Sequence, residues 1–373
     1  MDPDLLSSFD TRRVGILTGG GDCPGLNAVI RAVTRTVRSG YGATVVGIED
    51  GFEGLVESRV RELDVRDMTG MIREGGTMLG TSSKGDPWHY PIEGTDGSTE
   101  IVDMSARVLE SIERLALDAM VAVGGDGTMH IAHKLQARGV NVVGVPKTID
   151  NDLAATDRTF GFDTAVSVVA ESIDRLATTA SAHHRVMVIE VMGRYAGWIA
   201  LHGGLAGGAN VILIPEIPFR WDAVFRAVRD RATRGKRFSI VCVAEGAKLP
   251  DGSEVIQQTD VKRTDAKRLG GIGEVVARQI EQGTGLETRV TVLGHLQRGG
   301  SPTAFDRVLA TSFGVAAGHC VCRGQYGVMV ALRGTEIVPV PIEDAIARTS
   351  LVPPDHQLVG AARAVGTSFG DDG

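Results

Sequence analysis

A short polar segment, Pro-Lys-Thr-Ile-Asp-Asn-Asp at residues 146–152, directly follows the apolar run at 142–145. The apolar run predicts a buried strand that ends at the proline. If the segment stays extended, Asp150 and Asp152 lie on the same side of it, because side chains alternate along a strand. Two carboxylates so close together repel each other unless a cation or strong donors hold them. The segment is therefore a candidate reactive site, although Asp and Asn also favour ordinary solvated turns.

Two glycine-rich stretches stand where apolar runs end, and both suit phosphate binding. The first covers residues 19–25, and the second is Gly-Gly-Asp-Gly-Thr at 124–128. Glycine lets backbone N–H groups approach phosphate oxygens closely, and the helix that follows adds positive potential. The first stretch lacks the Gly-Lys-Ser/Thr of a P-loop and is weak support by itself. In the second stretch, Asp126 could hold magnesium.

Basic residues at the ends of later apolar runs predict a second phosphate site. Any one of them could be an ordinary solvated arginine. Together they would form a cage of guanidinium groups that can bind phosphate in a bidentate manner; they are Arg185, Arg194, Arg289 and Arg298. His295 stands beside Arg298 in a glycine-flanked stretch, and Glu245 could hold a sugar hydroxyl.

The elements that must position these residues alternate between apolar runs and amphipathic helical segments. Strands are expected at residues 14–17, 45–48, 119–123, 142–145, 186–191, 211–214, 240–244 and 289–293. This alternation predicts βα units and mostly parallel sheets, which bind ligands at the carboxyl ends of their strands. The glycine-rich stretches and residues 147–152 should therefore converge. The polar stretch 248–268 is expected to be an excursion from the core.

The composition fits an α/β enzyme and argues against several other classes. The chain has 373 residues, of which 43% are hydrophobic and 49 are glycine, and this predicts two domains with large cores. The net charge of −7 argues against nucleic-acid binding. No apolar stretch approaches about eighteen residues, so we expect no membrane span. The four scattered cysteines suit reduced thiols in a cytoplasmic protein.

Five motifs along the chain resemble those of the 6-phosphofructokinase family. They are Gly-Gly-Asp-Cys-Pro-Gly-Leu-Asn at 20–27, Gly-Gly-Asp-Gly-Thr at 124–128, Pro-Lys-Thr-Ile-Asp-Asn-Asp at 146–152, Met-Gly-Arg at 192–194 and His-Leu-Gln-Arg-Gly-Gly at 295–300. They span most of the chain in the family's order and are jointly very specific. The resemblance implies transfer of the γ-phosphoryl group of ATP to the 1-hydroxyl of fructose 6-phosphate.

The resemblance also implies roles for individual residues. Asp150 is the expected base, and Thr148 helps to hold the transferring group. The implied catalytic set is completed by Lys147 and Gly127, and the implied Mg²⁺ ligands are Asp126 and Asp152. The nucleotide would be lined by Gly21, Ser83, Lys84, Gly125, Asp126, Gly127 and Thr128. The sugar phosphate would be held by Thr148, Ile149, Asp150, Arg185, Met192, Gly193, Arg194, Glu245, Arg289, His295, Leu296, Gln297 and Arg298.

The implied fold is α/β, with two Rossmann-like domains, mainly parallel central sheets and an active site in the cleft between them. We expect three parts. Residues 1–161 with about 297–325 form a nucleotide domain, and residues 162–296 with about 326–355 form a sugar-phosphate domain. Residues 356–373 form a frayed tail. The resemblance further implies a homo-oligomer, usually a tetramer. In it, Arg185 and Arg289 would be supplied by the neighbouring subunit.

The sequence is divided on the phosphoryl donor. Gly127 is typical of ATP-using relatives, whereas Lys147 is typical of pyrophosphate users, although a longer ATP-using subgroup combines the two. Lys147 could either block part of the nucleotide space or fold back on Asp126 or Asp152. We expect Gly127 to decide for ATP, because a flexible lysine can move aside while a carboxylate at position 127 could not escape repulsion. The alternatives are a pyrophosphate-dependent enzyme or a catalytically weak sugar-phosphate-binding paralogue. The second is favoured only by Ser83, which replaces a usual arginine.

Overall fold

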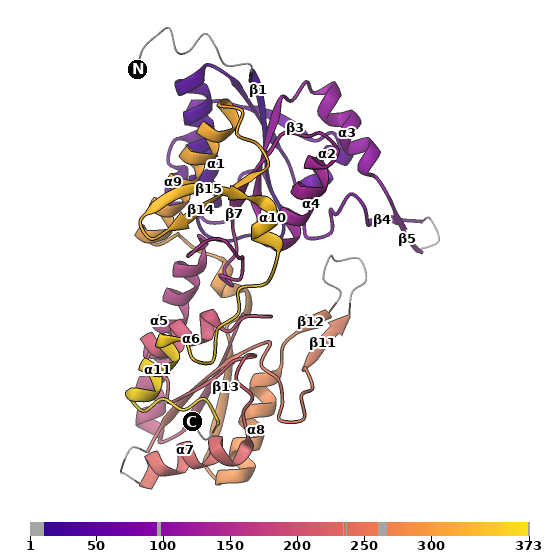
Figure 1. Cartoon of the computed structure of the whole chain (residues 1–373). Helices are drawn as coiled ribbons and strands as arrows, with labels where there is room; N and C mark the ends of the chain where they lie inside the picture. The colour runs from indigo at the N-terminus through magenta and orange to yellow at the C-terminus, as the bar shows by residue number, and fades with distance from the viewer. Residues whose placement is uncertain (1–10, 95–97, 234, 236, 260–266, 372–373) are drawn as a thin grey trace.

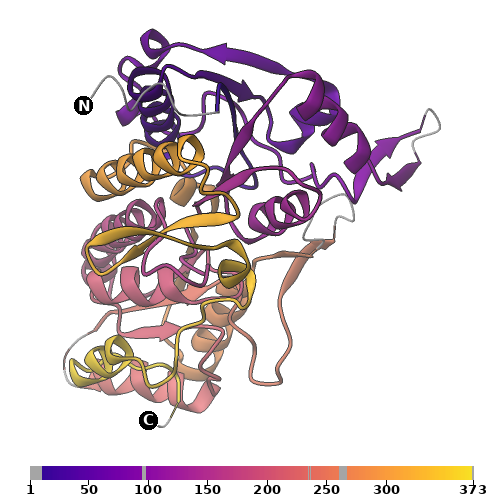
Figure 2. The same cartoon turned by 45° about the horizontal axis from the view of Figure 1, so that its top comes forward.

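The computed structural model describes residues 11–94, 98–233, 235, 237–259 and 267–371. They form two α/β units, one above the other in Figure 1, and the chain passes between the units more than once. Figure 2 shows the same two units with the upper one turned forward. Each unit has a central sheet of mainly parallel strands, as the sequence predicts.

The first unit is built on a seven-stranded sheet with the order β15-β14-β7-β6-β1-β2-β3. Its strands are β1 (Arg13–Thr18), β2 (Thr44–Ile48), β3 (Val60–Leu63), β6 (Ala119–Gly124), β7 (Val142–Pro146), β14 (Val328–Arg333) and β15 (Glu336–Pro341). The edge strands β3 and β15 are antiparallel to their neighbours, and the other pairs are parallel. The central strands β6 and β7 are fully buried, as expected for a parallel sheet covered on both faces.

Helices cover both faces of this sheet. Val14 and Ile16 of β1 face the core that contains α1 (Leu26–Arg35) and α9 (Ala304–Cys322). Leu17 faces the opposite core, which is formed with α2 (Phe52–Glu57), α3 (Ser105–Arg114), α4 (Asp126–Gln136) and α10 (Ile342–Ile346). The alternation of β1 residues between the two cores follows from the period of two along a strand. The remaining elements are a π-helical turn, two 3₁₀ turns and a hairpin: η2 (Thr36–Gly40), η3 (Val65–Met68), η4 (Met71–Arg73), β4 (Tyr90–Glu93) and β5 (Thr99–Val102).

The second unit has a four-stranded parallel sheet with the order β13-β8-β10-β9. Its strands are β8 (Val186–Val191), β9 (Val211–Leu213), β10 (Ser239–Ala244) and β13 (Thr288–Val292). One face is covered by α5 (Phe162–His183) and α6 (Trp198–Ala206), the other by α7 (Trp221–Thr233) and α8 (Ile272–Thr284). The 3₁₀ turn η5 (Gly294–Arg298) follows β13. The polar excursion predicted at 248–268 contains a separate antiparallel hairpin, β11 (Ile256–Thr259) and β12 (Lys267–Leu269); residues 260–266 lie outside the described part.

One part of the expected domain division is wrong. Residues 326–355 were assigned to the second domain, but β14 and β15 extend the sheet of the first unit. Val328 pairs with Val143, and Met329 pairs with Gly144 of β7. A parallel pair between segments so far apart in the chain cannot be inferred from the apolar pattern of either segment.

The expectation of a frayed tail at 356–373 is also wrong for the residues that the structure describes there. Helix α11 (Gln357–Ala364) packs against α6. Ser368 forms a parallel bridge with Val211 at the edge of the second sheet, and Phe369 is fully buried. Burial of this aromatic ring outweighs the usual tendency of chain ends to fray.

A buried polar network joins the two units. The Asp306 carboxylate, on α9 of the first unit, accepts hydrogen bonds from Thr164 N–H at 2.8 Å and from its hydroxyl at 2.6 Å, on α5 of the second. Thr303 donates its hydroxyl to Asp163 at 2.6 Å. Asp306 is fully buried, and burial raises its pKa to about 6. This network fixes the N-terminal ends of α5 and α9 against each other.

Candidate active site

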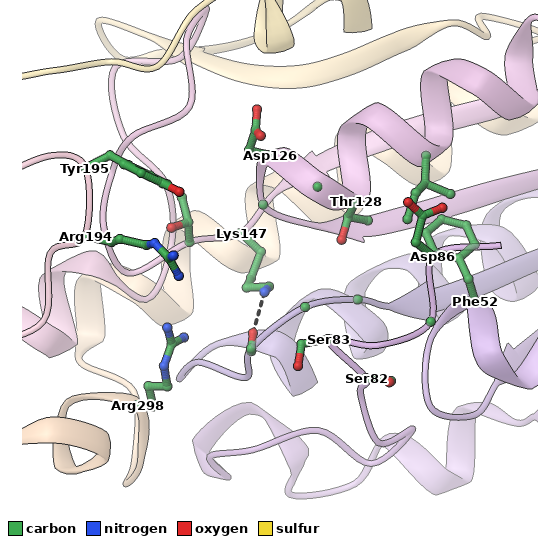
Figure 3. A pocket seen from close by; sticks show the side chains of 18 residues that line it. Phe52, Ser82, Ser83, Asp86, Asp126, Thr128, Lys147, Arg194, Tyr195 and Arg298 are labelled. Carbon is green, nitrogen blue, oxygen red and sulfur yellow. Dashed lines mark hydrogen bonds between the residues drawn. The ribbon is translucent and has the colours of Figure 1, made fainter. Parts of the chain in front are cut away.

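The first of two adjoining cavities lies at the carboxyl ends of β1, β6 and β7 and has a volume of about 450 Å³ (Figure 3). Both glycine-rich stretches contribute to it, as predicted from their positions after strands. Its polar and glycine lining includes the predicted nucleotide and catalytic residues Gly21, Ser83, Gly125, Asp126, Gly127, Thr128, Lys147 and Thr148. Its apolar lining includes Phe52 and Ile131. The cavity thus combines a phosphate-type wall with an apolar wall.

The glycines of these loops are required by close packing against one side chain. Thr128 is almost fully buried. A Cβ atom at Gly124 would lie 2.2 Å from Thr128 Oγ1, and one at Gly19 would lie 2.7 Å from the same atom. Thr128 therefore holds both loops together, and helix α4, which begins at Asp126, directs its N-terminus to the cavity. Free N–H groups and the helix dipole make this end attractive to phosphate.

Lys147 crosses the base of the first cavity. Its ammonium group donates to the carbonyl of Gly21 (Figure 3), and its side chain is buried. Burial lowers the pKa of Lys147 to about 8. Of the two placements open for this side chain, folding back on Asp126 or Asp152 is not observed, because its ammonium group bonds to the backbone carbonyl of Gly21. Lys147 thereby links the end of β7 to the loop after β1.

The second cavity, of about 290 Å³, adjoins the first and is lined mainly by the second unit. Gly21, Arg194 and Arg298 line both cavities. The predicted sugar-phosphate residues that line the second cavity are Asp150, Met192, Arg194, Glu245, His295 and Arg298. Figure 3 shows the guanidinium groups of Arg194 and Arg298 directed toward the same region beside Lys147. The boundary between the cavities is therefore strongly basic.

The carboxylate of Asp150 lines the second cavity, close enough to this boundary that the charges of Arg298, Lys147 and Arg194 act on it. One of its oxygens, Oδ1, is buried and has no hydrogen-bond partner. Burial raises the pKa of Asp150, and the opposing effect of Arg298, Lys147 and Arg194 is smaller. An unpartnered buried carboxylate oxygen is costly, so its retention requires a reason such as a bound group that donates to it. A raised pKa also makes the carboxylate a stronger base.

Asp152 lies near the carboxylate of Asp150, but this closeness does not come from alternation along an extended segment. The condition of an extended segment is not met, because Asn151 adopts a left-handed conformation with φ of 52°; the alternative of a turn describes the segment better. Its side-chain oxygen accepts from Thr159 N–H at 2.9 Å, which stabilises the turn. Burial, followed by the charge of Asp150, raises the pKa of Asp152 to about 7. The charge of Asp126 raises this pKa further, so Asp126 and Asp152 are close enough to repel each other.

A magnesium ion would fit Asp126 and Asp152 only with help from the substrate. The part of the chain that the structure describes has no group of three or more His, Cys, Asp or Glu side chains placed to hold a metal. Mg²⁺ is usually bound by one or two carboxylates together with substrate phosphates and water. The side chain of Asp126 is 58% exposed, and a cation there would relieve the repulsion at Asp152. The two residues therefore fit such an ion.

Glu245 and Glu190 form an acidic wall of the second cavity. Burial, then the charges of Asp150 and Glu190, raise the pKa of Glu245 to about 7. Glu190 has a structural task, because its carboxylate accepts the N–H of Gly271 at 3.0 Å and of Gly273 at 2.7 Å, at the start of α8. Of these two glutamates, Glu245 is therefore the one left to meet a sugar hydroxyl.

Several predicted substrate residues support the site without lining either cavity. Ile149 is part of the core. Gln297 is fully buried, accepts from Met192 N–H at 3.2 Å and donates to Gly294 O at 3.1 Å. Gly193 has a φ of 131°, and a Cβ atom there would lie 2.9 Å from a backbone oxygen. These residues shape the loops from which Met192, Arg194 and Arg298 project. Leu296, by contrast, is 68% exposed and lines neither cavity.

Arg185 and Arg289 also stand apart from the cavities of this chain. Arg185 Nε pairs with the Glu287 carboxylate at 2.8 Å, and Arg289 pairs with the same carboxylate. Lys84 likewise does not line the nucleotide-type cavity but a separate one between α2 and the β4–β5 hairpin. These three basic residues line neither of the two adjoining cavities, whereas Arg194 and Arg298 line both.

Sequence reasoning missed some lining residues. Ile131 follows Asp126 by little more than one helical turn, so helical periodicity could have indicated it. Phe52 follows the end of β2, and residues after the carboxyl ends of parallel strands are expected near ligands. Asp86, Tyr195 and Gln257 carried no comparable signal, because they lie in irregular segments or in the hairpin.

An enzyme that passes a phosphoryl group between two bound molecules needs two adjoining anion-binding cavities and dispersed positive charge between them. That arrangement places this chain among the phosphotransferases of the α/β class. The match to the family model described as "Phosphofructokinase" covers residues 13–321. The chain belongs to the phosphofructokinase family, which confirms the resemblance seen in its motifs.

Individual relatives agree on the sugar and differ on the donor. The chain is 52% identical to a protein of Chloroflexus aurantiacus named "ATP-dependent 6-phosphofructokinase", over 97% of this chain and 98% of that one. It is also 52% identical to the "Pyrophosphate--fructose 6-phosphate 1-phosphotransferase" of Streptomyces coelicolor, over 92% and 96%. Among solved structures, Pichia pastoris phosphofructokinase matches 96% of this chain with a TM-score of 0.77 and 30% identity. This chain spans 37% of that longer one.

Proposed function

We propose that the chain transfers the γ-phosphoryl group of ATP to the 1-hydroxyl of fructose 6-phosphate. The observation that carries the choice of ATP is the first cavity, where Phe52 and Ile131 offer an apolar surface beside the glycine loops. A nucleotide base can use such a surface, whereas pyrophosphate cannot. Gly127 also lines this cavity and adds no charge to it. The name of the Chloroflexus relative supports the same choice.

The proposed chemistry centres on Asp150. Its carboxylate takes the proton of the sugar 1-hydroxyl while that oxygen bonds to the γ-phosphorus of ATP. The bond between this phosphorus and the bridging oxygen breaks, and ADP leaves with the bond electrons. Arg298 and Arg194 balance the charge of the phosphates, since both line the two cavities. Thr148 lines the first cavity, and in this proposal it contacts the transferring group.

The proposal includes a magnesium ion bound to the donor phosphates and held by Asp126 and Asp152. When bound, it neutralises part of the phosphate charge. Asp152 is suited to this role because the charges of Asp150 and Asp126 act on its carboxylate, and a cation would offset them. Ser83 supplies a hydroxyl to the cavity, and Lys147 and Arg298 provide positive charge there.

We also propose a homo-oligomer, most simply a tetramer, whose subunits share the sugar-phosphate site. Arg185 and Arg289 line neither cavity of their own chain, and Glu287 gathers both at one place. A neighbouring subunit could receive them.

A cytoplasmic location is part of the proposal. Among the described residues, no helix combines the length and apolarity needed to cross a membrane.

The test is to incubate purified protein with fructose 6-phosphate, ATP and Mg²⁺ and to identify the products. We expect ADP and fructose 1,6-bisphosphate in equal amounts. Fructose 6-phosphate binding without turnover would contradict the proposal, and it would indicate the sugar-phosphate-binding paralogue if pyrophosphate also gave no turnover.

One second function is favoured by specific observations. Lys147 is present in the donor cavity. The Streptomyces relative named for pyrophosphate has the same 52% identity as the Chloroflexus one, over 92% rather than 97% of this chain. A pyrophosphate-dependent enzyme would make fructose 1,6-bisphosphate and phosphate from the same sugar without ATP. Turnover with pyrophosphate alone would establish this second function in place of the first.

A further inference from the structure

The second cavity has a wall that none of the sequence motifs contains. The hairpin β11–β12 supplies Gln257 and Leu269 to the lining, and Gly270 follows directly after it. Figure 1 shows β11 and β12 extending from the second unit toward the first. The polar excursion is therefore part of the site rather than a detached surface loop.

A β-bulge sets Gln257 apart from its neighbours in the hairpin. Ile256 pairs with Leu269, and Gln258 pairs with Arg268, so the register shifts between residues 256 and 258. Gln257 is the extra residue, with no partner opposite it. Bulges beside active sites commonly redirect a side chain out of the regular alternation. Here the redirected side chain lines the cavity.

The backbone behind Gln257 is anchored to the second sheet. A Cβ atom at Gly270, where φ is +136°, would lie 3.0 Å from Cδ and Nε2 of Gln257, so the amide lies against the bare glycine backbone. Gly270 N–H donates to Val255 O at 3.2 Å. The next residue, Gly271, donates to Glu190, which is 2% exposed on β8. The wall is thus continuous from β8 to the hairpin.

The chemistry of this side chain differs from that of the other polar groups around it. The polar side chains that line the cavity with it are Asp22, Asp150, Glu190, Arg194, Glu245, His295 and Arg298. Within that described lining, Gln257 carries the one carboxamide, which both donates and accepts hydrogen bonds without a charge. A sugar hydroxyl also donates and accepts, whereas a phosphate is better matched by arginine.

We propose that Gln257 is a further substrate-binding residue, supplied by the β11–β12 hairpin, whose carboxamide binds a hydroxyl of the sugar. The proposal rests on the proposed function, because it takes the second cavity as the sugar-phosphate site. It makes the hairpin a determinant of sugar specificity.

The test compares Gln257→Ala with the matched control Gln258→Ala. Gln258 has the same side chain, stands next in the strand, is exposed and does not line the cavity. Loss of one neutral hydrogen bond should raise KM for fructose 6-phosphate about 2- to 10-fold in Gln257→Ala. KM for ATP and kcat should stay within about twofold. An unchanged KM for the sugar, or an equal rise in Gln258→Ala, would overturn the proposal.

A second variant, Gln257→Glu, separates a hydroxyl contact from a phosphate contact. A carboxylate can still accept from a hydroxyl, so KM for fructose 6-phosphate should not exceed that of Gln257→Ala. A much larger rise would reveal repulsion from the sugar's phosphate and overturn the assignment to a hydroxyl.

Stabilisation of the wild-type protein by fructose 6-phosphate, measured as Tm without ATP, distinguishes the two levels of failure. If the wild-type protein shows neither stabilisation nor turnover, the proposed function and this proposal fall together. If wild-type behaviour is as expected and Gln257→Ala matches it, only the Gln257 proposal is overturned.

Discussion

The two cavities of the site are built by different means. The first is formed largely by backbone at the ends of three adjacent parallel strands, and Thr128 packs two glycine loops together. The second is formed by side chains from several separate elements, including a bulged hairpin. Arg194 and Arg298 belong to both. Donor binding should therefore depend on loop shape, and sugar binding on individual side chains.

The largest expected effect is at the boundary between the cavities. Asp150→Asn keeps the shape but removes the base, so kcat should fall about 10²- to 10⁴-fold. The dissociation constant for fructose 6-phosphate, measured by titration calorimetry, should change only a few-fold. Near-native turnover combined with lost binding would show that Asp150 is a binding group and not the base.

Arg298→Ala should have the next largest effect. Loss of a charge-assisted contact should raise KM for fructose 6-phosphate about 10- to 150-fold. KM for ATP should rise less, although the residue lines both cavities. Arg333→Ala is a suitable control, because Arg333 is a half-exposed arginine that lines neither cavity. Equal changes for both substrates would contradict the assignment of Arg298 mainly to the sugar phosphate.

Lys147→Met tests whether the lysine supports the donor cavity or selects the donor. Methionine keeps most of the buried stem but loses the bond to the Gly21 carbonyl. We expect kcat/KM for ATP to fall by less than about tenfold. The lost hydrogen bond also stabilises the loop after β1, so only part of its free energy contributes to ATP binding. ATP should remain the preferred donor. A change of preference between ATP and pyrophosphate would show that Lys147 selects the donor.

The smallest expected effect concerns stability. The pKa of Glu245 is raised to about 7 in the folded protein, above its ordinary value in an unfolded chain. The contribution of Glu245 to stability should therefore fall as pH rises from about 4 to 7 and then level off, because in this range folding takes up a proton that the unfolded carboxylate has lost. Glu245→Gln should raise Tm of the ligand-free protein by roughly 2–5 °C at pH 8 and not at pH 4. Equal shifts at both pH values would contradict a titrating Glu245.

The backbone-built cavity was the easier one to predict from sequence. Strand ends followed by glycine stretches identify it, because such loops have local signatures. The contact between Lys147 and the Gly21 carbonyl was not predictable, since it depends on the relative placement of β1 and β7. The left-handed turn at Asn151 was also missed, because its amide bonds to Thr159, eight positions further along the chain.

The side-chain-built cavity was predicted only in part. Motifs located Met192, Arg194 and Arg298, but they also included Gln297, which is a buried brace. Nothing local distinguishes Gln257 from Gln258, since a one-residue bulge decides which of them lines the cavity. The pairing of β14 with β7 escaped prediction for a similar reason, because register is a tertiary property.

The most direct test of the account is the ratio of kcat/KM for ATP to that for pyrophosphate, measured with saturating fructose 6-phosphate and Mg²⁺. An apolar wall at Phe52 and Ile131, with no charge at Gly127, predicts turnover with ATP and none with pyrophosphate. Gly127→Asp should then lower kcat/KM for ATP sharply, by at least about 100-fold, because a carboxylate would face the nucleotide phosphates in a poorly screened cavity. Robust turnover with pyrophosphate and none with ATP would contradict the account.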